Sequence, residues 1–383
     1  MAIVSSPSDT VCQLSGYLAE ESILSVLTKR TYQFDPRGRL VFSPIQLPLQ
    51  KDILFEDGSD ELVSADSDLV PWKPLTDIVV LGHAQVQEPR TDFRASIRIG
   101  TYSKTVLAIG ERQATFSASG RPVFSQPTQV AKLPLSFGLA YGGRDSLAEA
   151  KNGIPGSEYA HYFEVSTIKN LSPYLYPRNP CGRGYLVELS RESVESLKLP
   201  QLEDPTDRLR ADHLAAGHPL RWTGMPVPQS LGWSGLAWFP RVAYLGVAPE
   251  HEPSTKTLFE VSSGWAPIDI LEAKPIEKCF NMRACNGASL GLQVPYLRGD
   301  EDGSLHNLSP WYPVLRFVLP GERPRIWTDG RKGKLNETQP VIHSIVIEPD
   351  KARLSIVWRG SAPALRPYTD EELRQMPLRV EWR

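Results

Sequence analysis

The residues best placed for chemistry in this sequence are a serine flanked by glycines, and an aspartate and a histidine that follow it. Gly287-Ala288-Ser289-Leu290-Gly291 matches the G-x-S-x-G pattern, in which a sharp turn between a strand and a helix exposes a nucleophilic serine. Asp329 and His343 follow in the chain order of the α/β-hydrolase triad. In this interpretation His343 would take the proton of Ser289, and Asp329 would orient the imidazole.

The surroundings of Ser289 do not favour such an elbow. The turn needs a buried strand before the serine and a helix after it. Residues 281–286 are not an apolar run, and Pro295 would end any helix soon after the serine. The chain also lacks the alternating strand and helix periods of a parallel sheet. A serine hydrolase that uses Ser289 is therefore one alternative function, a structural or interaction module is the other, and a protein without catalysis is the principal expectation.

Patterns for metals and cofactors are weak. The segment 300–307 is rich in oxygen ligands but lacks the spacing and the closing glutamate of an EF-hand loop. A solvated acidic turn paired with Arg298 is the simpler interpretation. His213 and His218 are five residues apart, on different faces of any helix, and neither GxxxxGK[ST] nor a helix-opening GxGxxG occurs. We expect no metal and no cofactor. The scattered cysteines are expected to be reduced thiols: Cys12, Cys181, Cys279 and Cys285.

Three tryptophans lie among prolines and glycines in residues 220–246: Trp222, Trp233 and Trp238. Aromatic side chains dominate the energetics of protein interfaces, so these residues are candidates for partner binding. Burial in the core of a loop-rich layer is the competing interpretation, and the burial tendency of aromatic residues favours it. Arg298, Asp300 and Glu301 are further partner candidates, although paired charges near strand ends usually fix loop geometry first.

Composition limits the class of protein. The chain has 383 residues, 41% of them hydrophobic and 22% charged, which is ordinary for a globular protein. A formal net charge of −2 gives no broad basic field, so no nucleic-acid partner is expected. The sequence shows no secretory signal and no apolar window long enough to span a bilayer, which predicts a cytoplasmic protein without a membrane partner.

Strands must position these residues. The 34 prolines break helices repeatedly and favour many short strands joined by turns. In residues 69–113 we predict three consecutive strands, at 78–81, 93–99 and 105–109. In the second, Phe93, Ala95, Ile97 and Ile99 alternate with polar residues, so one face should be buried and the other wet. The three strands are expected to form a meander.

Other segments extend this pattern. Residues 23–32 and 40–47 read as a hairpin, as do 116–124 and the pair 341–347 and 353–358. The acidic segment 57–68 reads as a solvated loop. Short helices are expected after the caps Ser190 and Thr369. The fold class is therefore mainly β, with antiparallel sheets in a sandwich or barrel-like arrangement and few short helices.

A boundary is suggested where the sequence becomes irregular. Residues 144–184 are rich in proline, glycine and asparagine, which is typical of a linker or a long crossing loop. We predict an N-terminal β-rich meander region at 1–150 and a C-terminal β-rich region with aromatic and proline-rich loops at 151–383. The two regions are also compatible with one continuous domain.

The chain resembles a bacterial family, domain of unknown function 2169, over nearly its whole length. The family pattern has a Pro-x-Lys-Pro-x-x-Asp entry, a Gly-x-Ala strand end and a later Gly-[Asp/Glu]-Arg. The matching positions here are Pro71, Lys73, Pro74, Asp77, Gly82, Ala84, Gly110, Glu111 and Arg112. The resemblance continues through residues 140–143, 179–185, 199–205, 280–281, 297–301, 319–321 and 358–360. Two positions depart from it: His343-Ser344 replaces a usual Asp-Thr, and Cys181 replaces a small aliphatic residue.

This resemblance implies a role beside the type VI secretion apparatus. Members of the family look like accessory chaperones or adaptors, which help to load a toxic effector onto a spike-tip protein of the PAAR type. The expected partners are therefore an effector, a PAAR-type spike protein or both. Such an adaptor would act by binding alone, because binding a client shifts its folded population by mass action.

Overall fold

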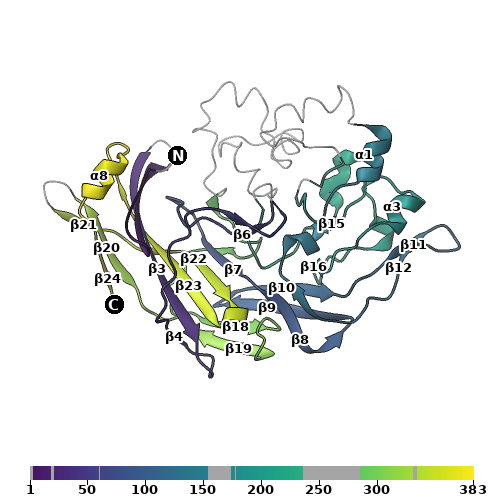
Figure 1. The fold of residues 1–383 in the computed structure, drawn as a ribbon, viewed down its shortest axis with the longest axis horizontal. Coiled ribbons are helices and arrows are strands. Elements are labelled where there is room, and N and C mark those ends of the chain that lie inside the picture. Colours follow the sequence, from purple (N-terminus) through teal and green to yellow (C-terminus); the bar gives the residue numbers. More distant parts are fainter. Residues whose placement is uncertain are drawn as a thin grey trace.

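The structure is a computed structural model that describes residues 3–18, 21–59, 61–153, 174–176, 178–235, 285–330 and 334–383. It is mainly β, as predicted, with several mostly antiparallel sheets, and the described residues form no closed barrel (Figure 1). Three α-helices appear in these ranges: α1 (Ser146–Asn152), α3 (Arg191–Glu195) and α8 (Asp370–Gln375). None of the described helices is long and apolar enough to cross a membrane.

The largest sheet has eight strands and joins distant parts of the chain. In spatial order they are β1 (Ile3–Ser8), β2 (Val11–Leu18), β3 (Glu21–Phe34), β23 (Arg353–Pro363), β22 (Val341–Glu348), β7 (Thr76–Val80) and β17 (Gln293–Val294), with β4 (Leu40–Phe42) paired to the end of β3. Only the pairing of β22 with β7 is parallel in this sheet. Strands from both sides of position 150 pair here, while the division into 1–150 and 151–383 stays a prediction.

A five-stranded sheet packs against this one. Its order is β16 (Leu202–Glu203), β10 (Tyr102–Ile109), β9 (Asp92–Ile99), β18 (Asp302–His306) and β19 (Val314–Val318). Ile78 and Ile345 of the large sheet share one hydrophobic core with Ile97, Leu305 and Phe317 of the smaller sheet. The two sheets therefore form a sandwich, with the core between their inner faces.

The remaining strands are short. They form the pairs β5 (Leu54–Phe55) with β6 (Val63–Ala65), β8 (His83–Arg90) with β13 (Val130–Pro134), β11 (Ala114–Phe116) with β12 (Pro122–Phe124), the parallel pair β14 (Tyr141–Gly142) with β15 (Arg183–Gly184), and the three-stranded set β21 (Leu335–Glu337), β20 (Pro324–Asp329) and β24 (Arg379–Trp382). Four 3₁₀ turns are η1 (Phe137–Leu139), η2 (Ala211–His213), η3 (Pro219–Gly224) and η5 (Pro349–Lys351).

The three strands predicted in residues 69–113 are present as β7, β9 and β10, but they do not form one meander. β9 and β10 make a hairpin, whereas β7 lies in the other sheet between β22 and β17, and β8 intervenes. Burial explains the difference. All five residues of β7 are buried, which suits an interior strand covered on both faces, whereas β9 alternates between buried and more exposed residues.

Candidate functional site

A buried ion pair lies at β7, next to the end strand of the large sheet. Lys73 Nζ lies 2.7 Å from Asp77 Oδ2, and both side chains are almost completely buried. The carboxylate of Asp77 also accepts hydrogen bonds from Asn286 Nδ2 at 3.0 Å and from the backbone N–H groups of Gly287 and Ala288 at 3.0 and 3.1 Å. Four donors thus compensate the cost of removing this carboxylate from water.

The strand pattern places Asp77 between two neighbouring strands of the large sheet. β7 pairs Asp77 with Ser344 of β22 and with Gln293 of β17. Because side chains alternate along a strand, Ile78 and Val80 point to one face of the sheet, and Asp77 and Val79 point to the other. Lys73 lies four residues before Asp77, in the segment that leads into β7, and its amine lies beside the Asp77 carboxylate.

Arg359 of β23 adds a second buried cation beside this pair. Its guanidinium donates to the carbonyl oxygen of Lys73 at 3.0 Å and to the hydroxyl of Tyr296 at 2.9 Å. It also lies over the ring of Trp72, 4.2 Å from the ring centre. Burial lowers the pKa of Arg359, and Tyr296 partly offsets that effect. The group remains a cation at neutral pH, since an arginine begins far above that range.

His343 completes the cluster without any hydrogen bond. Neither ring nitrogen has a partner among the described residues, although the side chain is fully buried. Burial, followed by the positive charges of Lys73 and Arg359, holds the pKa of His343 well below its usual value, so the ring is neutral at pH 7. Asn286 Oδ1, Ser344 Oγ and Arg359 Nε are also buried and unpaired. Each such atom costs about 1–3 kcal/mol.

The structure does not hydrogen-bond the predicted serine triad together. Since the nitrogens of His343 have no partner, neither Ser289 nor Asp329 is bonded to it. Asp329 lies in β20, in a third sheet. Ser289 Oγ instead accepts a hydrogen bond from Lys104 Nζ of β10 at 2.6 Å, and the same amine donates to the carbonyl oxygen of Leu290 at 2.7 Å.

Burial lowers the pKa of Lys104 to about 7, with a small opposing effect from Asp204. Its pKa is then lower in the folded than in the unfolded chain, where the ordinary value is 10.5. The unfolded chain binds more protons between these values, so the contribution of Lys104 to stability rises with pH from about 7 to about 10. We predict that the melting temperature of the wild type rises relative to that of Lys104→Met over this window.

Melting curves at several pH values check this prediction. Lys132 on β13 is an exposed lysine, and Lys132→Met serves as the control, which should follow the wild type at every pH. Parallel curves for the wild type and Lys104→Met would show that Lys104 keeps its ordinary protonation in the folded chain.

The two tryptophans that the structure describes, Trp222 and Trp233, lie in hydrophobic cores. Trp222 is buried and packs edge-on against Tyr176, with ring centres 6.3 Å apart. Trp233 is buried in the main core, and its ring centre lies 5.4 Å from Lys73 Nζ. Trp238 lies outside the described residues. Packing is thus the observed role of the first two, while partner contact remains a prediction for all three.

The acidic turn after β17 has the predicted partner. Arg298 Nε lies 3.2 Å from Asp300 Oδ1, and both side chains are exposed. The carboxylate of Glu301 accepts from the backbone N–H groups of Arg298 and Gly299 at 2.7 and 2.9 Å, which closes the turn. Among the described residues, no group of three or more His, Cys, Asp and Glu side chains is arranged to hold a metal ion.

A groove of about 550 Å³ opens on the outer face of the large sheet. Its apolar walls include Leu81, Val346 and Trp233. Asp66 and Asp68 line it and are buried, so the prediction of a solvated loop at 57–68 is wrong at its end. Asp68 pairs with the buried Lys29 at 2.9 Å, which explains how an acidic residue is held there.

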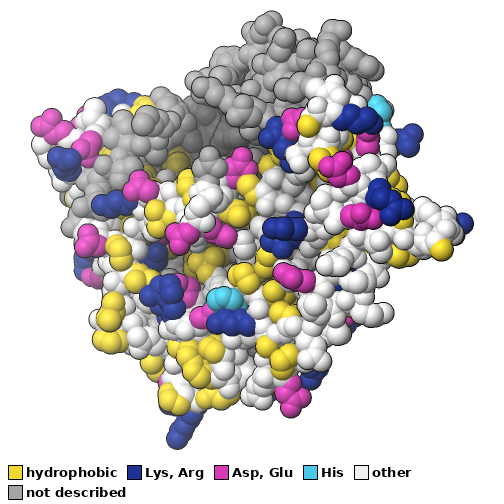
Figure 2. Space-filling view, turned by 45° about the vertical axis from the view of Figure 1, so that its right-hand side comes forward, with side chains coloured by type: hydrophobic (Ala, Val, Ile, Leu, Met, Phe, Trp, Pro, Cys, Tyr) yellow, Lys and Arg dark blue, Asp and Glu magenta, His cyan; other side chains and the backbone are white. Residues whose placement is uncertain are grey.

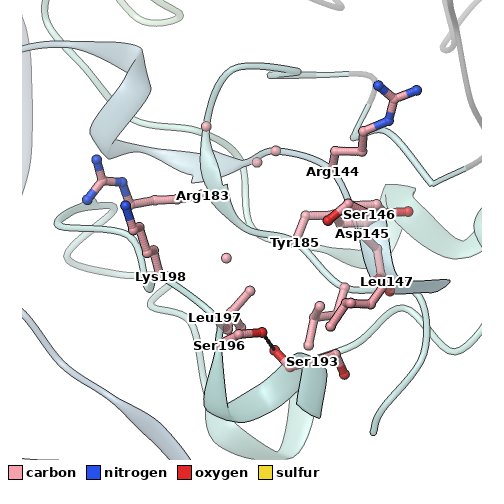
Figure 3. A pocket seen from close by; sticks show the side chains of 15 residues that line it. Arg144, Asp145, Ser146, Leu147, Arg183, Tyr185, Ser193, Ser196, Leu197 and Lys198 are labelled. Carbon is pink, nitrogen blue, oxygen red and sulfur yellow. Dashed lines mark hydrogen bonds between the residues drawn. The ribbon is translucent and has the colours of Figure 1, made fainter. Parts of the chain in front are cut away.

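A pocket of about 240 Å³ lies where two motifs of the sequence meet (Figure 3). Arg183 and Lys198 lie on one side of it and Arg144 on the other. Its backbone comes from β14 and β15, which pair in parallel. Gly142 has φ of +149°, and a Cβ there would lie 2.1 Å from the carbonyl oxygen of Asn179. The glycines of this motif therefore serve close backbone packing.

Exposed apolar side chains gather where the β3–β4 turn meets β19. Tyr312 donates to the carbonyl oxygen of Pro36 at 2.6 Å, and the rings of Phe34 and Phe317 are 5.5 Å apart, so the two segments are in contact. We call the exposed residues here the β4–β19 surface: Val41, Phe42, Ile45, Trp311, Tyr312 and Val318. Phe42, Trp311 and Val318 are 53%, 52% and 57% exposed.

The charges around such apolar groups are mixed. Figure 2 shows basic and acidic side chains interspersed over one face of the molecule, with hydrophobic side chains between them. That distribution gives no field of one sign, in agreement with the small net charge.

Sequence reasoning alone missed Lys104, Asn286 and Arg359. Asn286 directly precedes the serine motif, and Arg359 is part of a Trp-Arg-Gly motif, so both had a local signal. Lys104 had none, because it directly precedes an ordinary aliphatic run in β10.

Comparison with known proteins gives one match. The model of a family described as "Uncharacterized protein conserved in bacteria (DUF2169)" matches residues 19–359. No curated protein and no solved structure matches the chain.

Proposed function

This chain belongs to the bacterial DUF2169 family, and we propose from that premise that it is a non-catalytic adaptor of the type VI secretion system. It binds a toxic effector, a PAAR-type spike-tip protein or both, and assists the loading of the effector. The proposal implies a cytoplasmic location and involves no nucleic acid and no membrane. The proposal comes from the function that the resemblance to the family implies.

One structural observation supports a binding role: the β4–β19 surface. Exposed aromatic and aliphatic side chains on two segments that touch each other are typical of protein interaction sites. β19 is also the last strand of its sheet among the described residues, so one edge of it has no strand partner there. A client segment can add to such an edge through backbone hydrogen bonds, with Val318 and its neighbours supplying apolar contacts.

The first test is affinity capture of the tagged protein from its own bacterium, with mass spectrometry of the bound proteins. We expect an effector, a PAAR-type protein or both. A folded and abundant bait that captures neither would contradict the proposal.

The captured partner then tests the surface. We predict that Trp311→Ala weakens its binding about 10-fold or more, since buried aromatic anchors contribute most of the energy of an interface. Binding is measured by titration calorimetry with purified proteins. Leu365 is 79% exposed and lies outside the β4–β19 surface, so Leu365→Ala is the matched control and should bind like the wild type. Equal affinity for both variants would place the interface elsewhere.

A serine hydrolase that uses Ser289 is the second candidate function. The observation that favours it is the hydrogen bond from Lys104, because a lysine with a lowered pKa can remove the proton of a serine. Ester hydrolysis that disappears in Ser289→Ala would support this candidate. Absence of turnover, or turnover that Ser289→Ala leaves unchanged, would remove it.

A further inference from the structure

One carboxylate accepts hydrogen bonds from both a lysine and an asparagine. Asp77 Oδ2 accepts from Lys73 Nζ at 2.7 Å, and Asp77 Oδ1 accepts from Asn286 Nδ2 at 3.0 Å. All three side chains are buried. An amine, an amide and a carboxylate between them are the three groups needed to join a lysine to an asparagine through an amide bond.

The orientation of the Asn286 amide is determined by its neighbours. Nδ2 donates to Asp77 Oδ1 and also to the carbonyl oxygen of Leu75 at 2.9 Å, and both of these atoms are acceptors. Exchange of the nitrogen and oxygen of the amide would place an acceptor against two acceptors. The nitrogen, which would be the leaving group, is therefore the atom held against the carboxylate.

The surroundings favour condensation over hydrolysis. The ring of Trp233 lies 5.4 Å from Lys73 Nζ, and Lys73, Asp77 and Asn286 have almost no contact with solvent. Exclusion of water removes the competing nucleophile. Fixed proximity replaces a bimolecular encounter, which corresponds to a large effective concentration of the amine.

We propose that Lys73 and Asn286 form an intramolecular isopeptide bond, with Asp77 transferring the protons. The ammonium of Lys73 gives a proton to Asp77, and the neutral amine attacks Cγ of Asn286. The new bond joins Nζ to Cγ, the proton that the attacking nitrogen loses passes to Nδ2, and the bond from Cγ to Nδ2 breaks to release ammonia. The released ammonia takes the proton from Asp77 and leaves as ammonium, so the carboxylate is regenerated. The reaction needs no oxidant, reductant or cofactor.

Such a bond would tie the segment that precedes β7 to the segment that precedes β17. The cross-link closes residues 73–286 into one covalent loop and restricts the unfolded chain, as a disulfide does. This inference does not depend on the proposed function, since it concerns the scaffold and not the β4–β19 surface.

The mass of the intact, denatured full-length protein tests the proposal directly. We expect a mass lower than that of the sequence by about 17 Da, the loss of one ammonia. Proteolysis and tandem mass spectrometry should recover one branched peptide that joins Lys73 to Asn286. Lys73→Arg and Asn286→Ala should restore the mass expected from their sequences. Asn286→Asp should still cross-link, with the loss of water, about 18 Da, in place of ammonia.

Lys29→Arg is the matched control. Lys29 and Asp68 form a second buried pair at 2.9 Å, but no side-chain amide is bonded to that carboxylate. This variant should keep the full mass loss. A wild-type mass equal to that of the sequence, both when fresh and after prolonged incubation, would overturn the proposal. A branched peptide that joins Lys73 to Asp77 would overturn it as well, because Asp77 would then be a reactant.

Discussion

Replacement of Asp77 by alanine is expected to destabilise the protein by about 3–5 kcal/mol, because the charge of Lys73 would remain buried without its partner. The substitution also removes the acceptor of Asn286 and of the backbone N–H groups of Gly287 and Ala288. With an unfolding entropy proportional to chain length, this corresponds to a melting temperature lower by roughly 4–6 °C. Differential scanning calorimetry of the purified variant measures it.

Asp300→Ala provides the comparison. Asp300 is an aspartate of the same family pattern, but it is exposed and paired only with the exposed Arg298. Its loss should change stability by no more than about 0.5 kcal/mol. An unchanged melting temperature for Asp77→Ala would mean that neighbouring groups reorganise to compensate Lys73, which the close contacts around it do not favour.

Local patterns predicted the local structure well. The alternation in residues 93–99 is observed in β9, where Phe93, Ala95, Ile97 and Ile99 are buried. The caps Ser190 and Thr369 begin α3 and α8, each with a capping box. These features depend on neighbours within a few residues, so the sequence contains the information directly.

Contacts between distant residues could not be predicted in this way. Asp77 and Asn286 are 209 residues apart, and Lys104 and Ser289 are 185 apart. No period in the sequence links such positions, since they meet only after the sheets have formed. The triad prediction relied on the chain order of Ser289, Asp329 and His343. The order of residues along the chain does not determine which of them meet in the fold.

The burial of charged residues could not be predicted from local patterns either. Asp66 and Asp68 follow an acidic run that reads as a solvated loop, yet both are buried, and Asp68 is paired with Lys29 of β3. An isolated carboxylate would not be buried, so the missing information was the distant cation. Arg112 and Glu203 form a comparable pair: both are buried, and they lie on segments that β10 and β16 bring together.

Gly110→Ala is expected to have the other large effect, because the chain passes another backbone segment at this point. A Cβ on residue 110 would lie 1.8 Å from the carbonyl oxygen of Thr128 and 2.7 Å from its carbonyl carbon. Atoms of the backbone cannot rotate away as a side chain can, so residues near 128 must shift. We expect a loss of about 3 kcal/mol or more, seen as a lower melting temperature and a lower soluble yield.

Two further variants separate the clash from other causes. Gly224→Ala should be nearly neutral, because a Cβ at that glycine meets no atom within 4 Å. Thr128→Ala removes the γ-methyl group and the hydroxyl that accepts from the N–H of Glu111 at 3.0 Å, and should cost about 1 kcal/mol. The double variant Gly110→Ala with Thr128→Ala should not recover, since the clash involves the carbonyl group and not the side chain. If the double variant recovered its stability, the segment near 128 would be held mainly by the Thr128 hydroxyl. Gly110 would then be required for chain flexibility and not to avoid a clash.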